Sequence, residues 1–203
     1  MKEKPLLAVY GGAFSPPHVG HIALAEAFCR TVRPERFLII PSSVSPHKAA
    51  VPGATPKDRL QMCRLAFSAI PAEVSDIELS RPGKSYTVET LEALSGKGHR
   101  LMLLVGTDMF LTLGSWYRAA DIFALAEIAV GRRETDPGVT TLLLEKEEEY
   151  RARYGAKICF IDYEPIEISS TEIRKRLIEK EPLDGYITKE VEAYIRECHL
   201  YPD

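Results

Sequence analysis

Six short apolar runs recur along the chain, and segments with helical spacing separate most of them. The runs are LLAVY (6–10), RFLIIP (36–41), AEVSDIEL (72–79), RLMLLVG (100–106), EIAVG (127–131) and AKICFID (156–162). Apolar runs of this length are typical of buried strands. Strands that alternate with helices form β-α-β units, in which a parallel sheet carries helices on both faces. The pattern therefore predicts an α/β fold of the doubly wound class with a mostly parallel sheet.

The segments between the runs carry the start and stop signals of helices. VGHIALAEAFCRTV (19–32) has apolar residues at helical spacing, TPKDRLQMCRLAFSAI (55–70) begins with a Thr cap and a Pro, and SYTVETLEALSG (85–96) ends in Gly. LLLEKEEEYRARYGAK (142–157) predicts a charged, solvent-facing helix with no chemistry of its own. Two short amphipathic helices are expected in the C-terminal segment, 168–203.

Length and composition limit the classes of partner. A chain of 203 residues supports one sizeable core, so we expect a single domain over 1–203. A net charge of -3 gives no general attraction to nucleic acid or to an anionic membrane, and no apolar stretch approaches the roughly 20 residues that cross a bilayer. The four cysteines are scattered. We expect a cytoplasmic enzyme with reduced thiols, no nucleic-acid or membrane partner, and a local anion site.

The first apolar run leads into two glycines and then two histidines, in LAVYGGAFSPPHVGHIAL. A strand, a turn and a helix in this order place a helix N-terminus over the end of a strand, and such a terminus attracts phosphate. Gly11 and Gly12 permit a ligand to approach the backbone, and Gly20 keeps space between the histidines. His18 and His21, three apart, lie on one side of the helix, within reach of a phosphate chain.

Other interpretations of this turn are open at the level of the motif. A bare H-x-x-H also fits ordinary surface or capping histidines, and the sequence offers no third ligand at zinc spacing, so no metal site is predicted in the protein. The turn is neither a Walker loop, which needs G-x-x-x-x-G-K-[ST], nor a G-x-G-x-x-G dinucleotide fingerprint.

A second helix start suited to phosphate lies near the C-terminus, in ISSTEIRKRL (168–177). We expect a strand, then the hydroxyls of Ser169 and Ser170 at the helix start, and Arg174 one turn later. A plain capped helix with a solvated basic face is the alternative. Two such helix starts in one doubly wound domain favour the phosphate-binding interpretation more than either does alone.

The motifs GGAFSPPHVGH and ISSTEIRKRL together resemble those of the H-x-G-H nucleotidyltransferases. Further stretches resemble the bacterial nicotinate-nucleotide adenylyltransferases, in the family's order and over almost the whole chain. They are PSSVSPHK, ELSRPGKSYTVETLEAL, LLVGTDMFLTLGSWYRAADIF and VEAYIRECHLY. The resemblance implies a Rossmann-like nucleotidyltransferase fold in which segment 168–203 completes the ATP site. It implies a reaction of ATP with nicotinate mononucleotide that yields deamido-NAD and pyrophosphate, with Mg²⁺ carried by ATP.

The resemblance also implies roles for particular residues. The catalytic residues would be His18, His21 and Arg174. The ATP-binding residues would be Gly11, Gly12, Ala13, Phe14, His18, Gly20, His21, Gly106, Asp108, Ile168, Ser169, Ser170 and Arg174. The residues that bind nicotinate mononucleotide would be His47, Lys48, Thr87, Trp116, Tyr117 and Arg133. On residue type alone, a helix cap explains an aspartate like Asp108 equally well, and a core or surface position is the preferred explanation for a lone tryptophan like Trp116.

Two departures from the family pattern bear on function. Ala13 and Ser15 stand where members usually carry Thr and Asp, and Glu134-Thr135 replaces the usual Pro-Gly after Arg133. Two alternatives therefore accompany the main prediction. One is another adenylyl- or cytidylyltransferase of the superfamily, acting on phosphopantetheine or glycerol phosphate. The other is a nucleotide-binding regulator without turnover. The sequence leaves monomer and homo-oligomer equally open.

Overall fold

The computed structural model describes residues 4–44, 53–81, 83–96, 98–132, 137–164, 166 and 168–202. Its strands form one six-stranded sheet within these residues, in the order β3-β2-β1-β4-β5-β6. The strands are β1 (Leu6–Gly12), β2 (Arg36–Pro41), β3 (Glu73–Val74), β4 (Arg100–Gly106), β5 (Ala126–Gly131) and β6 (Ile158–Ile161). Every neighbouring pair is parallel. The predicted doubly wound parallel sheet is thus confirmed.

The central strand is β1, and the order of the sheet reverses beside it. Tyr10 of β1 pairs with Ile39 of β2 on one side and with Leu104 of β4 on the other. From β1 the chain builds outward to β3 and then returns to add β4, β5 and β6 on the opposite side. In open sheets of this kind, ligands bind beyond the carboxyl ends of the strands at the point of reversal. That point is the end of β1, where the glycines lie.

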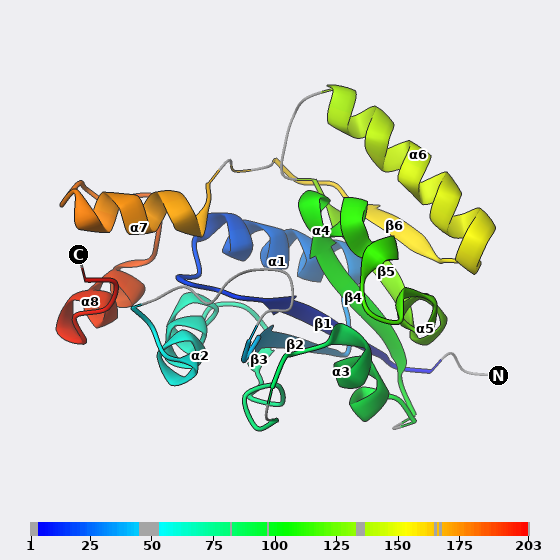
Figure 1. Ribbon diagram of the computed structural model, residues 1–203, viewed down its shortest axis with the longest axis horizontal. Helices are drawn as coiled ribbons and strands as arrows, with labels where there is room; N and C mark the ends of the chain where they lie inside the picture. The colour runs from blue at the N-terminus through cyan, green and yellow to red at the C-terminus, as the bar shows by residue number, and fades with distance from the viewer. Residues whose placement is uncertain are drawn as a thin grey trace.

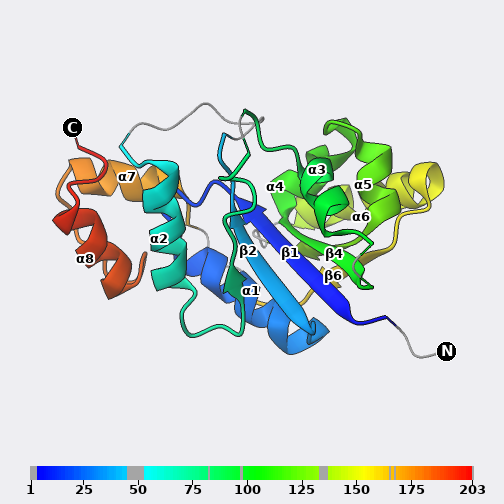
Figure 2. The same cartoon turned by 90° about the horizontal axis from the view of Figure 1, so that it is seen from below.

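Helices cover both faces of the sheet, as Figures 1 and 2 show. They are α1 (Val19–Val32), α2 (Pro56–Ala66), α3 (Thr87–Leu94), α4 (Thr107–Thr112), α5 (Ala119–Leu125), α6 (Pro137–Tyr154), α7 (Ser170–Ile178) and α8 (Lys189–Glu197), with a 3-10 helix η1 (Leu113–Ser115) after α4. None of these helices is long and apolar enough to cross a bilayer.

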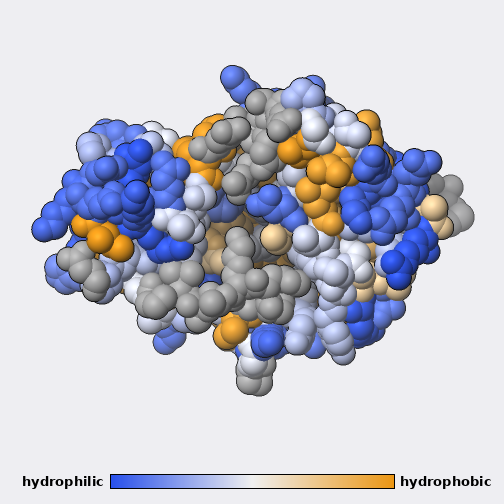
Figure 3. Space-filling model, turned by 45° about the horizontal axis from the view of Figure 1, so that its top comes forward, coloured by the Kyte–Doolittle hydropathy of each residue, from blue (hydrophilic) through white to orange (hydrophobic). Residues whose placement is uncertain are grey.

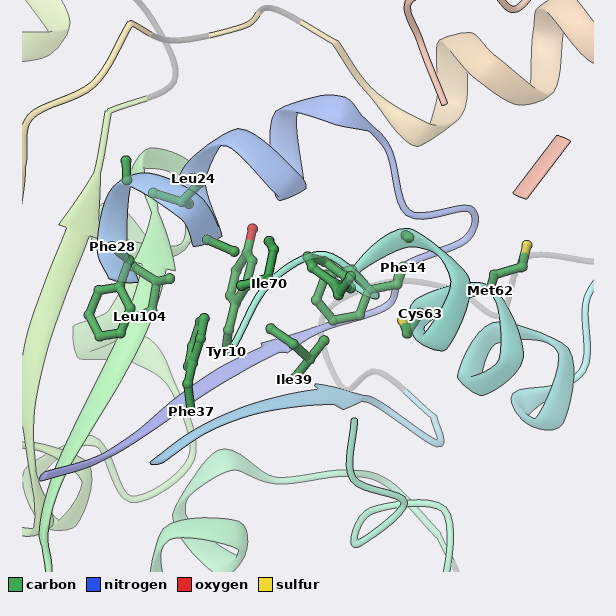
Figure 4. Close-up of a cluster of buried hydrophobic side chains, with 14 of the residues drawn as sticks. Tyr10, Phe14, Leu24, Phe28, Phe37, Ile39, Met62, Cys63, Ile70 and Leu104 are labelled. Carbon is green, nitrogen blue, oxygen red and sulfur yellow. The ribbon is translucent and has the colours of Figure 1, made fainter. Parts of the chain in front are cut away.

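Alternate residues of β1 enter two separate cores. Ala8 and Tyr10 join the cluster with α1, α2, α7 and α8, part of which Figure 4 draws. Leu7 and Val9 join the cluster with α3, α5 and α6 on the other face. Because side chains alternate across a strand, a strand buried on both faces reads as a continuous apolar run. This is why LLAVY shows no polar alternation.

Two strand predictions need correction. The run 72–79 pairs in the sheet only at Glu73 and Val74, because the chain turns away from the sheet edge and Glu78 faces the interior instead. No described residue between the end of β6 at Ile161 and the start of α7 belongs to a strand, so the predicted strand directly before Ser169 is absent from that described part. The predicted helix over 19–32 is confirmed with those bounds.

The helix predicted over 142–157 is longer and less exposed than its composition indicates. It begins at Pro137 and ends at Tyr154, and two of its side chains, Leu143 and Tyr150, are almost fully buried. The two predicted C-terminal helices are α7 and α8, and α8 lies against α2 at one end of the sheet (Figure 1). These helices therefore flank the carboxyl end of β1.

Candidate active site

A pocket opens at the reversal of the sheet, between the ends of β1 and β4. Figure 3 looks onto this hollow. A Cβ added at Gly106 would meet nothing within 4 Å, and one at Gly11 would meet only the Ile40 carbonyl oxygen at 4.0 Å, so both backbones are open to a ligand. Gly12 differs, because its Cβ would lie 2.9 Å from the ring of Phe14. Gly11 thus leaves the backbone accessible to a ligand, whereas Gly12 leaves room for the Phe14 ring.

The two histidines lie together at the start of α1, on the wall of this pocket. His18 is the N-cap and His21 is in the first turn, and their ring centroids are 3.6 Å apart. The His18 backbone N–H donates to Nδ1 of His21 at 3.2 Å. A neutral imidazole that accepts at Nδ1 carries its proton on Nε2. His21 can therefore donate a hydrogen bond from Nε2.

The environment of the histidine pair holds both rings. A Cβ at Gly20 would lie 3.2 Å from Nδ1 of His18 and 3.3 Å from the Ile166 carbonyl oxygen, which is tighter than most real Cβ contacts. Phe14 contacts His21 edge to face, with centroids 5.0 Å apart. The sequence interpretation of Gly20 as a spacer between the histidines agrees with this geometry.

The loop between β1 and α1 is held by the C-terminal segment. Ser15 is buried, and its hydroxyl forms a hydrogen bond of 3.0 Å with the hydroxyl of Tyr201. Nη1 of Arg174 donates to the Ser15 carbonyl oxygen at 2.6 Å, and the Ser170 hydroxyl donates to the Pro16 carbonyl oxygen at 2.9 Å. These contacts bring the N-terminus of α7 beside that of α1, so two helix starts face one site.

A buried arginine on α2 fixes the same loop from the other side. Arg59 donates to the Ala13 carbonyl oxygen at 2.8 Å and to the Ser43 carbonyl oxygen at 2.9 Å. Its side chain therefore joins the segment after β1 to the segment after β2. Burial lowers the pKa of Arg59 from its usual value, and nearby Glu78 opposes that shift. An arginine remains charged in proteins, so the guanidinium keeps its donors.

Polar groups also line the far wall of the pocket, formed by α3 and the segment before it. Thr87 begins α3, and Glu78, Ser85 and Thr90 lie beside it. The Thr90 hydroxyl donates to the Glu78 carboxylate at 2.8 Å, and the Ser85 hydroxyl accepts from the Ser43 backbone N–H at 2.9 Å. Burial raises the pKa of Glu78, and its hydrogen bonds with Thr90 and Ser85 oppose the rise.

The segment after β4 supplies a second carboxylate and an indole to the pocket. Asp108 lies in the first turn of α4, and Trp116 follows η1 directly. Both line the pocket, and the Trp116 ring is half-buried, with Nε1 3.4 Å from the Thr112 hydroxyl. Thr107 anchors the start of α4 because its hydroxyl donates to the Gly131 carbonyl oxygen at 3.3 Å.

Most of the residues predicted for the site surround this one pocket. Those that line it are Gly11, Gly12, Ala13, Phe14, His18, Gly20, His21, Thr87, Gly106, Asp108, Trp116, Ile168 and Ser170. Ser169 caps α7 instead, accepting from the Glu172 backbone N–H, and Arg174 contacts the β1–α1 loop from behind. Tyr117 is exposed, and its ring lies tilted against that of Tyr86, with centroids 4.6 Å apart. His47, Lys48 and Arg133 lie outside the described residues.

Sequence reasoning missed the residues that support the site from behind. Arg59, Glu78 and Tyr201 are buried polar side chains, each bonded to a loop or helix of the pocket. Glu78 and Tyr201 lie at the ends of two stretches that resemble the family, ELSRPGKSYTVETLEAL and VEAYIRECHLY, but no role was predicted for either, and Arg59 lies in none of the quoted motifs. A charged residue on the apolar face of a predicted helix, as Arg59 is on α2, is the one signal that the sequence contained for this group.

Solved structures share the fold. Nicotinic acid mononucleotide adenylyltransferase from Plasmodium falciparum, complexed with NaAD, superimposes with a TM-score of 0.76 at 17% identity, covering 97% of both chains. A structure described as a nicotinate-nucleotide adenylyltransferase from Vibrio parahaemolyticus gives a TM-score of 0.63 at 20% identity, covering 97% of this chain and 95% of that one. At such low identity, these matches establish the shared fold alone.

Sequence comparison gives closer relatives. The cytidylyltransferase-like family model matches residues 9–176. A probable nicotinate-nucleotide adenylyltransferase from Roseiflexus sp. is 37% identical over 203 residues, 99% of this chain and all of the relative. One from Caldicellulosiruptor saccharolyticus is 33% identical over 97% of this chain and 99% of the relative. The family resemblance drawn from the motifs is thereby confirmed: this chain belongs to the nicotinate-nucleotide adenylyltransferase family, within the cytidylyltransferase-like nucleotidyltransferases.

Proposed function

We propose that the chain transfers the adenylyl group of ATP to nicotinate mononucleotide, yielding deamido-NAD and pyrophosphate, a step of NAD biosynthesis. In this reaction a phosphate oxygen of the mononucleotide attacks the α-phosphorus of ATP, and the bond from that phosphorus to the bridging oxygen of pyrophosphate breaks. The observation that carries the proposal is one pocket that joins the H-x-G-H pair at one end to Thr87 and Trp116 at the other. A two-substrate transfer needs such a continuous site.

Catalysis would rest on alignment and on stabilising negative charge. Adenylyl transfer needs no covalent intermediate on the protein, and most of its barrier is lowered by positioning and electrostatics. His21 would donate from Nε2 to an oxygen of the α-phosphate, beside the ring of His18. Because His18 is buried and His21 contacts Phe14, these donors are preorganised in a site of low polarity, where they are most effective.

The remaining ATP contacts would come from the neighbouring helix start and from the segment after β4. Ser169 and Ser170 begin α7, whose N-terminus favours the β- and γ-phosphates, with Arg174 one turn later. Asp108 suits the two hydroxyls of a ribose. The phosphate groups of ATP need a counter-charge, which Arg174 supplies in part.

A divalent ion would supply the rest of that counter-charge, and we propose Mg²⁺. In the described part of the chain no three His, Cys, Asp or Glu side chains come together as a metal cage. This fits Mg²⁺, which keeps several waters and is commonly held through substrate phosphates. Bound in that way, it would neutralise charge on the triphosphate.

The far wall of the pocket would receive the pyridine ring. Trp116 would stack on the ring, and Thr87 with the backbone amides at the start of α3 would bind the carboxylate of the nicotinate. A group of donors favours an anionic acceptor over a carboxamide, which brings donors of its own. The acid form is therefore the expected substrate.

A pyrophosphate-release assay tests the proposal. The chain with Mg²⁺ and ATP should release pyrophosphate with nicotinate mononucleotide and much less with nicotinamide mononucleotide, phosphopantetheine or glycerol phosphate. Thr87→Val should narrow the gap between acid and amide. Binding without release would indicate a regulator, and turnover with one of the other acceptors would indicate a different transferase. The buried bond between Ser15 and Tyr201 argues against a degraded site, since it orders the loop without the family's usual Asp.

A further inference from the structure

Helix α6 packs against the segment that carries Asp108 and Trp116, and its Tyr150 is bonded to the backbone of that segment. The Tyr150 hydroxyl donates to the Phe110 carbonyl oxygen at 3.0 Å and accepts from the Gly114 backbone N–H at 2.9 Å. Tyr150 is 1% exposed, so water does not compete for these bonds. One hydroxyl thus joins two points of the backbone on either side of the junction between α4 and η1.

Those two points lie close to the residues proposed to bind substrate. Phe110 follows Asp108 by two positions in α4, and Gly114 is separated from Trp116 by Ser115 alone. The Trp116 backbone N–H also donates to the Leu113 carbonyl oxygen at 3.1 Å, which closes the η1 turn. The distance from the carboxylate to the indole is therefore set by a short backbone segment that Tyr150 holds on both sides.

The ring of Tyr150 leaves little freedom in this arrangement. It packs edge to face on Phe110, with centroids 5.3 Å apart, and lies 4.9 Å from the ring of Phe123. A Cβ at Gly114 would lie 2.8 Å from Cε1 of Tyr150. Ring and backbone are thus in direct contact, so a shift of the ring moves the η1 turn.

We propose that Tyr150 is a positioning residue that sets the Trp116 ring for binding of the pyridine nucleotide. The proposal rests on the function proposed above. Without the hydroxyl, the Phe110 carbonyl oxygen keeps the Leu113 N–H as a donor, but the Gly114 N–H loses its buried partner, and the η1 turn must move to find another. The cost appears in binding of the mononucleotide, because Trp116 follows η1 directly, whereas the chemical step depends on the distant histidine pair.

Tyr150→Phe tests this with little risk to folding, because the ring and its packing remain. Trp116 is the only tryptophan, so intrinsic fluorescence reports on it alone. We expect a changed ligand-free emission spectrum, a KM for nicotinate mononucleotide about two- to tenfold higher, as loss of one buried hydrogen bond implies, and a kcat within about twofold of the parent. The matched control is Tyr154→Phe, one turn along α6, whose ring stacks on Phe123 and whose hydroxyl has no hydrogen bond among the described residues.

Gly114→Ala approaches the same contact from the backbone side and should reproduce the spectral change and the higher KM, even where Tyr150→Phe is too unstable to assay. An unchanged spectrum and an unchanged KM in Tyr150→Phe would overturn the proposal, as would the same changes in Tyr154→Phe. If the parent does not turn over nicotinate mononucleotide, the proposed function fails by itself, and the ligand-free spectra still decide whether Tyr150 sets the environment of Trp116.

Discussion

Tyr201→Phe removes one oxygen from the contact that joins the C-terminal segment to the β1–α1 loop. The Tyr201 hydroxyl is bonded to the Ser15 hydroxyl, and both side chains are at most 5% exposed. Phenylalanine keeps the packing of the ring but leaves the Ser15 hydroxyl buried without this partner. A buried polar group that loses its partner costs about 1 to 3 kcal/mol. We therefore expect the free energy of unfolding to fall by about that amount.

The loss is measurable by urea unfolding and by thermal melting. For a chain of this size, it corresponds to a fall in Tm of about 3 to 8 °C. The KM for ATP should also rise, by about two- to fivefold, because the loop that Ser15 belongs to borders the proposed phosphate site. Tyr194→Phe is the matched control: it removes a hydroxyl of α8 that is bonded to Asp58, away from the loop, and should lower stability without changing the KM for ATP.

A double-mutant cycle isolates the bond itself. Ser15→Ala removes the other hydroxyl, so the pair Ser15→Ala with Tyr201→Phe leaves neither oxygen unsatisfied. The double variant should be more stable than the sum of the single losses predicts, by about 0.5 to 1.5 kcal/mol. Additive losses, or a Tyr201→Phe variant as stable as the parent, would refute the reasoning.

The same tyrosine predicts a dependence of stability on alkaline pH. Burial raises the pKa of Tyr201 from 10.0 to about 12. Between these values the unfolded chain has lost the phenolic proton and the folded chain retains it, so stability falls as pH rises from about 10 to about 12. A pKa shift of this size corresponds to a loss of about 2 to 3 kcal/mol in the free energy of unfolding. Other tyrosines also titrate, so the free energy of unfolding is measured for both the parent and Tyr201→Phe. The difference between these two free energies should narrow as pH rises over this range.

Three further predictions concern the site directly. His21→Ala should lower kcat by about 10² or more with little change in Tm, because it removes one preorganised donor; near-normal kcat would exclude this role. Arg174→Lys keeps the charge but loses the planar fork that reaches the Ser15 carbonyl oxygen, so the kcat/KM for ATP should fall well below the parent value, and full activity would show that charge alone suffices. Trp116→Ala should weaken binding of the acid and amide mononucleotides equally, by about 1 to 3 kcal/mol, as measured by titration; a loss confined to one would argue against ring stacking.

The sequence predicted the layers of the fold because its signals are local. The runs at 36–41 and 100–106 are strands with those bounds, and Thr55 caps α2 with its hydroxyl bonded to the Asp58 N–H. The run at 72–79 failed because alternation cannot distinguish an edge strand from a buried turn. In that run Glu78 is buried, and its carboxylate accepts a hydrogen bond from the Thr90 hydroxyl of α3.

The site residues could be predicted from the sequence only where they belong to a contiguous motif. The histidine pair and the glycines near it fall between residues 11 and 21, so residue type and spacing sufficed for them. Tyr150 and Arg59 act on loops far away in sequence, and nothing near either residue indicates its partner. Their roles depend on which elements the topology brings together, and that information is absent from local spacing.

The reversal of the sheet beside β1 also bears on how the protein folds. β1 and β2 are joined through one helix, α1, so their pairing is local, whereas pairing of Tyr10 with Leu104 closes a long stretch of chain. Pairing of high contact order is slow, so the β1–β4 seam is expected to form late. The pocket lies across that seam, and nucleotide bound there, as proposed above, would tie the two halves together. Backbone amides of β1 and β4 should accordingly exchange with deuterium more slowly in the presence of ATP, even at positions that the ligand does not touch.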